Sequence, residues 1–287
     1  MPRKAKRKSK ASVDARTRAV RCSAREKEAA TETPAGDPGA EVAARRHAET
    51  LAGAADFLRG CQGADRSSAA DPQRNRIEQQ HVQEWARAQG CLIDERGFAS
   101  LTLISNSTSE HEVWFRESDR RAVKRTWPGF FGQVPVWKGE RLDRIPATPL
   151  QYLERQLLHN EVFDGDIVLE GVCVSSKPSM IIGEDPGQPS FVISQPFIKA
   201  TNRDSATPTE QQISTFLSAH GFEPVPGSYF GWQRAADGVV ILDARRDNFI
   251  LSDAGVIPID LQMAVVPEII HANAPRKRAP KARRRSV

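Results

Sequence analysis

The apolar pattern of this chain begins late. Residues 1–72 contain almost no large apolar side chain before Leu51 and are rich in Ala, Arg, Lys, Glu, Gly and Ser. Such a stretch buries too little apolar surface to offset the chain entropy lost on ordering. We therefore expect residues 1–72 to form a poorly ordered arm. Within it, the alanine content of residues 41–58 favours a helix with a thin apolar face, and residues 63–72 read as a linker.

From residue 73 onward the apolar positions follow the periods of regular secondary structure. Apolar residues at helical spacing predict one helix that ends before Gly90, namely Ile77, Val82, Trp85 and Ala86. The period then changes to that of β-structure, which predicts three strands joined by polar turns, at residues 99–104, 111–115 and 122–126. A β-meander is the simplest arrangement, and the glycines and prolines of residues 128–135 predict an irregular loop after it.

The second half of the chain alternates helix and strand. Thr148 and Pro149 are suited to the N-cap and first position of a helix that runs to Phe163. A second helix is predicted over residues 207–220, with Pro208 at its first position and Gly221 as its stop. Apolar runs predict strands at residues 167–174 and 191–198, and a strand, a tight turn at residues 252–255 and a further strand near the end.

The positive charge of the chain is confined to its two ends. The net charge is +5, but residues 1–30 hold 11 Lys/Arg against 3 Asp/Glu, and residues 276–287 hold 7 against none. Residues 31–275 therefore carry 23 basic and 33 acidic side chains. A basic nucleic-acid-binding domain is not indicated, although the basic ends suit weak, salt-dependent contact with nucleic acid. We expect a folded domain at residues 73–268 and a disordered basic tail at residues 269–287.

The residue content and its distribution along the chain disfavour several classes of protein. The sequence has no run of 18 apolar residues, and its basic start is not followed by the apolar stretch of a secretory signal. The four cysteines are scattered without a CxxC pair, which favours free thiols in a reducing compartment. We therefore expect a cytoplasmic protein without membrane contact.

The candidate chemistry is concentrated in residues 241–262. Asp243 is followed five residues later by Asn248, and Asp260 closes an apolar strand. A strand, a tight turn and a strand would bring Asn248 and Asp260 to the same end of a hairpin. Oxygen ligands of this kind suit Mg²⁺, and Asp243 is placed to reach a substrate hydroxyl.

These residues resemble the protein-kinase-like fold. Asp-x4-Asn, a hairpin and then Ile-Asp-Leu are similar to its catalytic loop and metal-binding aspartate. The resemblance covers about residues 95–265 and is nearest to the aminoglycoside phosphotransferase branch and to the small kinase domains of bacterial and phage polyvalent proteins. It implies an α+β fold of two lobes, an antiparallel sheet with one helix and a minimal second lobe.

The resemblance also implies a role for each candidate residue. Lys124 would hold the phosphates of ATP and Glu154, or alternatively Glu161, would orient Lys124. Backbone groups of Gln195 to Phe197 would meet adenine, and Ser107 in the loop SNSTSE would line the phosphates. Asn248 and Asp260 would bind Mg²⁺, and Asp243 would accept the proton of the acceptor hydroxyl. The function implied is phosphate transfer from Mg²⁺-ATP to a protein or small-molecule acceptor.

The sequence departs from that family at three places. The loop SNSTSE lacks glycines, Leu242 stands where the catalytic-loop histidine is expected, and Gln262 replaces the glycine after the metal-binding aspartate. Two alternatives therefore stay open. One is a nucleotide-binding pseudokinase without efficient transfer, and the other is a non-enzymatic protein that contacts nucleic acid through its basic ends. Each residue also has an ordinary interpretation, since Asp and Asn are frequent in turns and most strand lysines are solvated.

Overall fold

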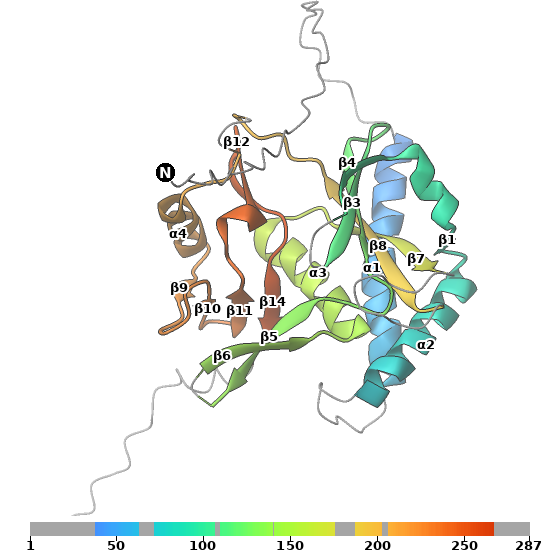
Figure 1. Ribbon diagram of the computed structural model, residues 1–287, viewed down its shortest axis with the longest axis horizontal. Helices are drawn as coiled ribbons and strands as arrows, with labels where there is room; N and C mark the ends of the chain where they lie inside the picture. The colour runs from blue at the N-terminus through green and yellow to red at the C-terminus, as the bar shows by residue number, and fades with distance from the viewer. Residues whose placement is uncertain are drawn as a thin grey trace, which may run out of the picture. The chain divides into compact units, whose positions relative to one another are not determined.

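The computed structural model describes residues 38–62, 72–106, 110–139, 141–175, 187–202 and 206–266, and these ranges form an α+β fold (Figure 1). The predicted fold class is confirmed at this level. The basic ends and Ser107, for which the sequence made predictions, lie outside the described residues. No described helix combines the length and the apolar character that a membrane crossing needs.

A six-stranded sheet forms the first layer. Its strand order is β1-β7-β8-β4-β3-β2, with β1 (Leu92–Ile93), β2 (Thr102–Ser105), β3 (His111–Arg116), β4 (Arg121–Thr126), β7 (Val168–Val174) and β8 (Pro189–Pro196). The strands β2, β3 and β4 form the predicted meander. Because the short edge strand β1 pairs in parallel with β7, the sheet is mixed, whereas the sequence predicted an antiparallel one.

Three helices pack together with this sheet around one apolar core. They are α1 (Pro38–Cys61), α2 (Pro72–Gln89) and α3 (Pro149–Phe163). The side chains of Leu51 and Leu58 in α1 are each 1% exposed and belong to the same cluster as Trp85 and Tyr152. The sequence placed α1 in a disordered arm that ended at residue 72, and this is wrong for residues 51–58. Two leucines and two alanines of this helix are buried because α2, α3 and the sheet strand β7 pack against them.

A second, smaller sheet follows the first in the chain. Its order is β14-β11-β10-β9, with β9 (Glu223–Pro224), β10 (Trp232–Arg234), β11 (Val239–Leu242) and β14 (Gln262–Val265). Together with α4 (Glu210–Ala219) it encloses a second core that includes Leu217, Phe222 and Ile241. Leu158 near the end of α3 lies in this second core, while Leu153 lies in the first. The helix α3 therefore joins the two cores (Figure 1).

The loop predicted at residues 128–135 is partly a hairpin instead. The strands β5 (Gln133–Lys138) and β6 (Arg141–Pro146) pair antiparallel as a two-stranded sheet of their own. Pro135 made a strand look unfavourable here, because a proline has no backbone N–H to donate to a neighbouring strand. In a two-stranded ribbon this costs little, since each strand has one edge that needs no partner.

Two helices each begin directly after a threonine whose side chain caps the first turn. Thr148 and Gln151 form a capping box at the start of α3, with Pro149 at the first helical position, as predicted. In α4 the cap is Thr209, whose side chain accepts from the backbone N–H of Gln212. The predicted start at residue 207 is therefore too early.

A tight hairpin carries the candidate chemistry. The strands β12 (Phe249–Ser252) and β13 (Gly255–Pro258) pair through the predicted turn, where Gly255 has a φ of 108°. The short 3-10 helix η3 (Arg246–Asn248) precedes β12, and a second 3-10 helix, η1 (Glu95–Ser100), precedes β2. Because η3 leads directly into β12, Asn248 is fixed at the open end of the hairpin.

The position of α1 in the core makes a stability prediction. We expect Leu58→Ala to lower the free energy of unfolding by about 2–5 kcal/mol, because it leaves a cavity in a closely packed core. Phe57→Ala is the matched control, since Phe57 is 38% exposed and its loss should cost less. Urea denaturation of both variants tests this. A small loss for Leu58→Ala, no greater than that for Phe57→Ala, would mean that α1 contributes little to the core.

Candidate functional site

Six of the eight site residues predicted from sequence line one cavity of about 560 Å³. They are Lys124, Gln195, Phe197, Asp243, Asn248 and Asp260. The cavity is bounded by one face of β3 and β4, by the end of β8, and by the segment from Asp243 to Gln262. Residues that are more than 100 positions apart in the sequence are thus brought to one place.

Asp243 stands in a strained turn. It follows the last residue of β11 and has a φ of 65°, in the left-handed region that Asp and Asn tolerate better than most residues. The Asn248 side chain donates to the Asp243 carbonyl at 2.6 Å and to its carboxylate at 3.2 Å. The Nε of Arg245 lies 2.7 Å from the same carboxylate. Asp243 is therefore held by one amide and one cation at the edge of the cavity.

The hairpin sets the position of Asp260, as the sequence predicted. The backbone N–H of Ile259 donates to the carbonyl of Asn248 at 2.9 Å, which closes the ladder of β12 and β13 at that end. The Asp260 side chain is 37% exposed. Burial raises its pKa, but the surrounding positive charges, of which Lys124 contributes most, together outweigh burial and leave the pKa below its ordinary value.

Lys124 lies on β4 and is almost fully buried. It is 7% exposed, and its Nζ donates to the carbonyl of Ile259 at 2.5 Å. Burial lowers the pKa of Lys124, while the charges of Asp260 and then Glu110 oppose that shift. A solvated strand lysine, which was the ordinary interpretation, is therefore wrong for this residue.

The structure does not bring Glu154 to Lys124. The Glu154 carboxylate is 42% exposed and accepts from the Nε of Arg59 at 3.0 Å. The alternative, Glu161, lines the same separate cavity as Glu154, between α3, β5 and β14. Side chains three and four positions apart share a helix face, so Tyr152, Arg155 and His159 occupy a different face of α3 from Glu154 and Glu161.

A buried carboxylate that the sequence analysis did not single out lies in the cavity wall. Glu110 is 7% exposed, and both of its carboxylate oxygens contact the guanidinium of Arg155, one of them at 3.1 Å. His111 places its Nε2 3.4 Å from Glu110 and 3.0 Å from the Tyr152 hydroxyl. In the sequence, the one feature that could have pointed to Glu110 is its position, as an acid where a polar loop meets a strand.

Glu110, His111 and Asp260 form the one group among the described residues with ligand atoms near enough to share a metal ion, within 4.8 Å of one another. The His111 Nδ1 is 3.9 Å from Asp260. Arg155 already neutralises Glu110, which weakens the attraction of this trio for a divalent cation.

The end of β8 forms the apolar part of the cavity. Gln195 pairs with Ala122 of β4, and the ring of Phe197 lies 4.7 Å from that of Phe115. The backbone N–H of Phe197 donates to the carbonyl of Arg120 at 2.9 Å. That N–H is therefore engaged within the sheet, because the β4–β8 ladder extends one bond beyond the strands. The prediction that backbone groups of Gln195 to Phe197 meet adenine stays a prediction for the other groups of this segment.

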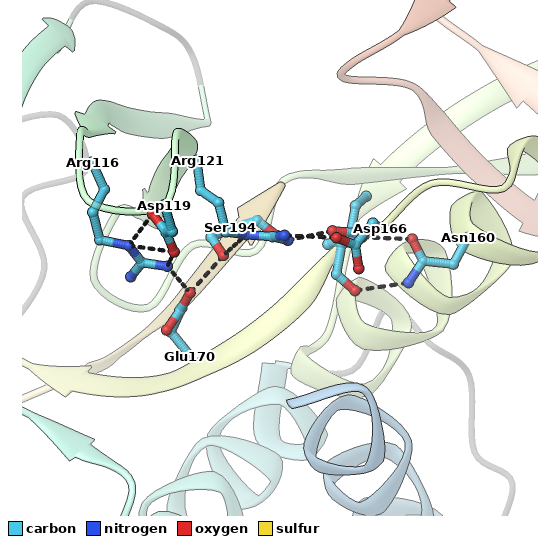
Figure 2. A network of polar contacts seen from close by, with 8 residues as sticks. Arg116, Asp119, Arg121, Asn160, Asp166, Glu170 and Ser194 are labelled. Atoms are coloured by element: carbon cyan, nitrogen blue, oxygen red, sulfur yellow. Dashed lines mark hydrogen bonds and ion pairs between the residues drawn. The ribbon is translucent and has the colours of Figure 1, made fainter. Parts of the chain in front are cut away.

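A polar network holds the end of β8 in place (Figure 2). Ser194 donates to Glu170 on β7 at 2.5 Å and accepts from the Nε of Arg121 at 2.8 Å. Arg116 reaches the same carboxylate of Glu170 at 2.7 Å, and Arg121 reaches Asp166 at 2.6 Å. Because Ser194 precedes Gln195, these bonds fix the wall of the cavity against the strands on either side.

His159 on α3 makes a pH-dependence prediction. It is 6% exposed, and among the described residues neither ring nitrogen has a hydrogen-bond partner. Burial lowers its pKa to about 4, and the positive charge of Lys124 acts in the same direction. The unfolded chain binds this proton near pH 6.5, so the free energy of unfolding should fall by about 3 kcal/mol between pH 6.5 and 4.

The measurement is chemical denaturation as a function of pH, for the wild type, His159→Gln and His220→Gln. We expect His159→Gln to flatten the loss at acid pH, and the control His220→Gln, at a partly exposed position, to keep it. A profile that His159→Gln leaves unchanged would contradict the assignment.

Comparison of the chain with protein-family models, with curated proteins and with solved structures finds no match.

Proposed function

We propose that this protein transfers a phosphate group from Mg²⁺-ATP to a hydroxyl of a protein or small-molecule acceptor, on a kinase-like two-lobe fold. One observation carries the proposal. The resemblance assigns a role to each of four residues, and all four line the same cavity. They are Lys124, Asp243, Asn248 and Asp260. The cavity has the six-stranded sheet on one side and the segment that precedes β14 on the other, which is consistent with a site between two lobes.

The charges of the cavity suit phosphate transfer. This reaction needs positioning and charge neutralisation more than covalent chemistry from the protein. Lys124 supplies a largely buried cation, whose attraction for phosphate is stronger than that of a cation in water. Asp243 supplies a carboxylate that is held in one orientation by Asn248, as a group that must accept a proton from a hydroxyl needs to be.

The residues present fit a magnesium ion. The amide nitrogen of Asn248 is engaged by Asp243, so its amide oxygen is the atom suited to a cation. Asp260 has a pKa below its ordinary value and is ionised at neutral pH, ready to act as the second ligand. When bound, the ion would neutralise phosphate oxygens while Asn248 and Asp260 hold it.

A second candidate is nucleotide binding without efficient transfer. The carboxylate of Asp243 is paired with Arg245 at 2.7 Å, which places a competing cation on the group that the acceptor hydroxyl needs. Transfer requires that this pair open or that Arg245 turn to the phosphates. A protein in which the pair stays closed would bind ATP and turn it over poorly.

The nucleotide site is tested by thermal unfolding with and without Mg²⁺-ATP. Ligand at 100 times its Kd should stabilise the native state by about 2.7 kcal/mol, a rise in Tm of a few degrees. We expect Asp260→Asn to lose the Mg²⁺-dependent rise, and the control Asp253→Asn, in the exposed turn of the same hairpin, to keep it. No rise in the wild type at millimolar nucleotide would contradict the proposal.

Transfer is tested separately by phosphate release from ATP, with water as the acceptor. Asp243→Asn keeps a residue that tolerates the left-handed backbone and removes the proton acceptor. We expect it to bind ATP as tightly as the wild type and to lower turnover by about 10²–10⁴-fold. Equal turnover in wild type and variant at equal binding would support the second candidate instead.

A further inference from the structure

Glu110 is held at an unusual position for a carboxylate. It stands at the start of β3, 7% exposed, in the wall of the cavity that contains Lys124. Gly132 leaves the space that the carboxylate fills, because a Cβ at this residue would overlap the carboxyl group of Glu110. The φ of 74° at Gly132 also favours glycine. The backbone is therefore shaped around this side chain.

Arg155 fixes the carboxylate from the opposite direction. Its guanidinium is 2% exposed on the face of α3 that carries Tyr152, and it contacts both oxygens of Glu110. A second bond reaches the carbonyl of Gln133 at 3.4 Å. This paired geometry leaves Glu110 little freedom to turn, and it ties the position of the carboxylate to that of the helix.

Glu110 belongs to a cluster of four buried or half-buried charges. Lys124 and Arg155 carry the positive charges, and Glu110 and Asp260 carry the negative ones, with His111 in contact with both acids. Lys124 is opposite Val113 in the β3–β4 register, and the side chains of His111, Val113 and Lys124 line the same cavity. Glu110 therefore lies next to the strand face from which Lys124 projects.

A bound metal ion would change the balance of charges in the cluster. Asp260 would then direct its charge to the cation, and Glu110 would be the remaining acid among the described residues of this cluster. We propose that Glu110 is the positioning residue of Lys124, and that Arg155 on α3 holds Glu110 in that role. The helix thus supplies a cation that anchors the carboxylate, and the carboxylate itself comes from the start of β3. This inference rests on the proposed nucleotide site and deepens it.

The test uses an acyl-phosphate derivative of ATP, which acylates a lysine amine that lies against the phosphates. The full-length protein is labelled with Mg²⁺ present, and the rate at Lys124 is followed by peptide mass spectrometry. The variants are Glu110→Gln, the double variant Glu110→Gln/Arg155→Met, and the matched control Glu154→Gln. The double variant matters because a single change leaves Arg155 buried without a partner, which destabilises the fold.

We expect the wild type and Glu154→Gln to be labelled at Lys124 at equal rates. Both Glu110 variants should be labelled at least about tenfold more slowly, because small displacements of a positioned group cost this much or more. The double variant should keep a cooperative unfolding transition and still label slowly. Excess unlabelled ATP should protect Lys124 in the wild type.

Two results would overturn the inference, and they are distinguishable. If Glu110→Gln labels slowly but the double variant labels as fast as the wild type, Glu110 has a purely structural role opposite Arg155, and the nucleotide site stands. If the wild type is not labelled at Lys124, or ATP does not protect it, the proposed nucleotide site fails and the inference fails with it. Slow labelling of Glu154→Gln would mean that Glu154 on α3, and not Glu110, positions Lys124.

Discussion

The structure depends on the burial of α3 against two cores at once. Leu153 packs in the first core and Leu158 in the second, so little of the helix is left for solvent. This forces the guanidinium of Arg155 into the interior, where an unpaired charge would be very costly. Glu110 neutralises it, and Gly132 leaves room for Glu110. One buried ion pair thus links α3, the start of β3 and the segment before β5.

The same pair determines the electrostatics of the candidate site. A helix residue that must be cationic brings a carboxylate into the cavity wall, and that carboxylate acts on Lys124 together with Asp260. Charges of opposite sign therefore lie close together in a region shielded from solvent. In such a place each charge is sensitive to the loss of any other, which is why the binding of a cation or a phosphate would be felt throughout the cluster.

The rest of the site depends on backbone hydrogen bonds. The β12–β13 ladder joins Asn248 to Ile259 and so sets the spacing between Asn248 and Asp260. The network of Ser194 and Glu170 ties the end of β8 to β7 (Figure 2). Sites placed on regular elements keep their geometry better than sites placed on loops. Asp243 is the exception, since its left-handed conformation is imposed by the turn between β11 and η3.

The sequence by itself determined the elements whose signals are local. The cap at Thr148, the meander of β2 to β4, and the turn at residues 252–255 each follow from residues close together in the chain. The same is true of the placement of Asn248 and Asp260 at one end of the hairpin, because one precedes β12 and the other follows β13. Lys124 could be chosen since its order along the chain resembles that of a known fold, although nothing local separates it from a solvated lysine.

Only the tertiary structure decided which partners meet across long separations. Glu154 and Arg155 are neighbours on α3, and the choice between them depends on how the helix is rotated against two cores, which no local pattern specifies. Residues 51–58 look too weakly apolar to fold alone, yet they are buried because α2, α3 and β7 surround them. Glu110 and Gly132 are well separated in the sequence, and no local pattern near either residue predicts that the carboxylate fills the space at the glycine. Their meeting results from packing, because burial of one charge requires another to lie beside it.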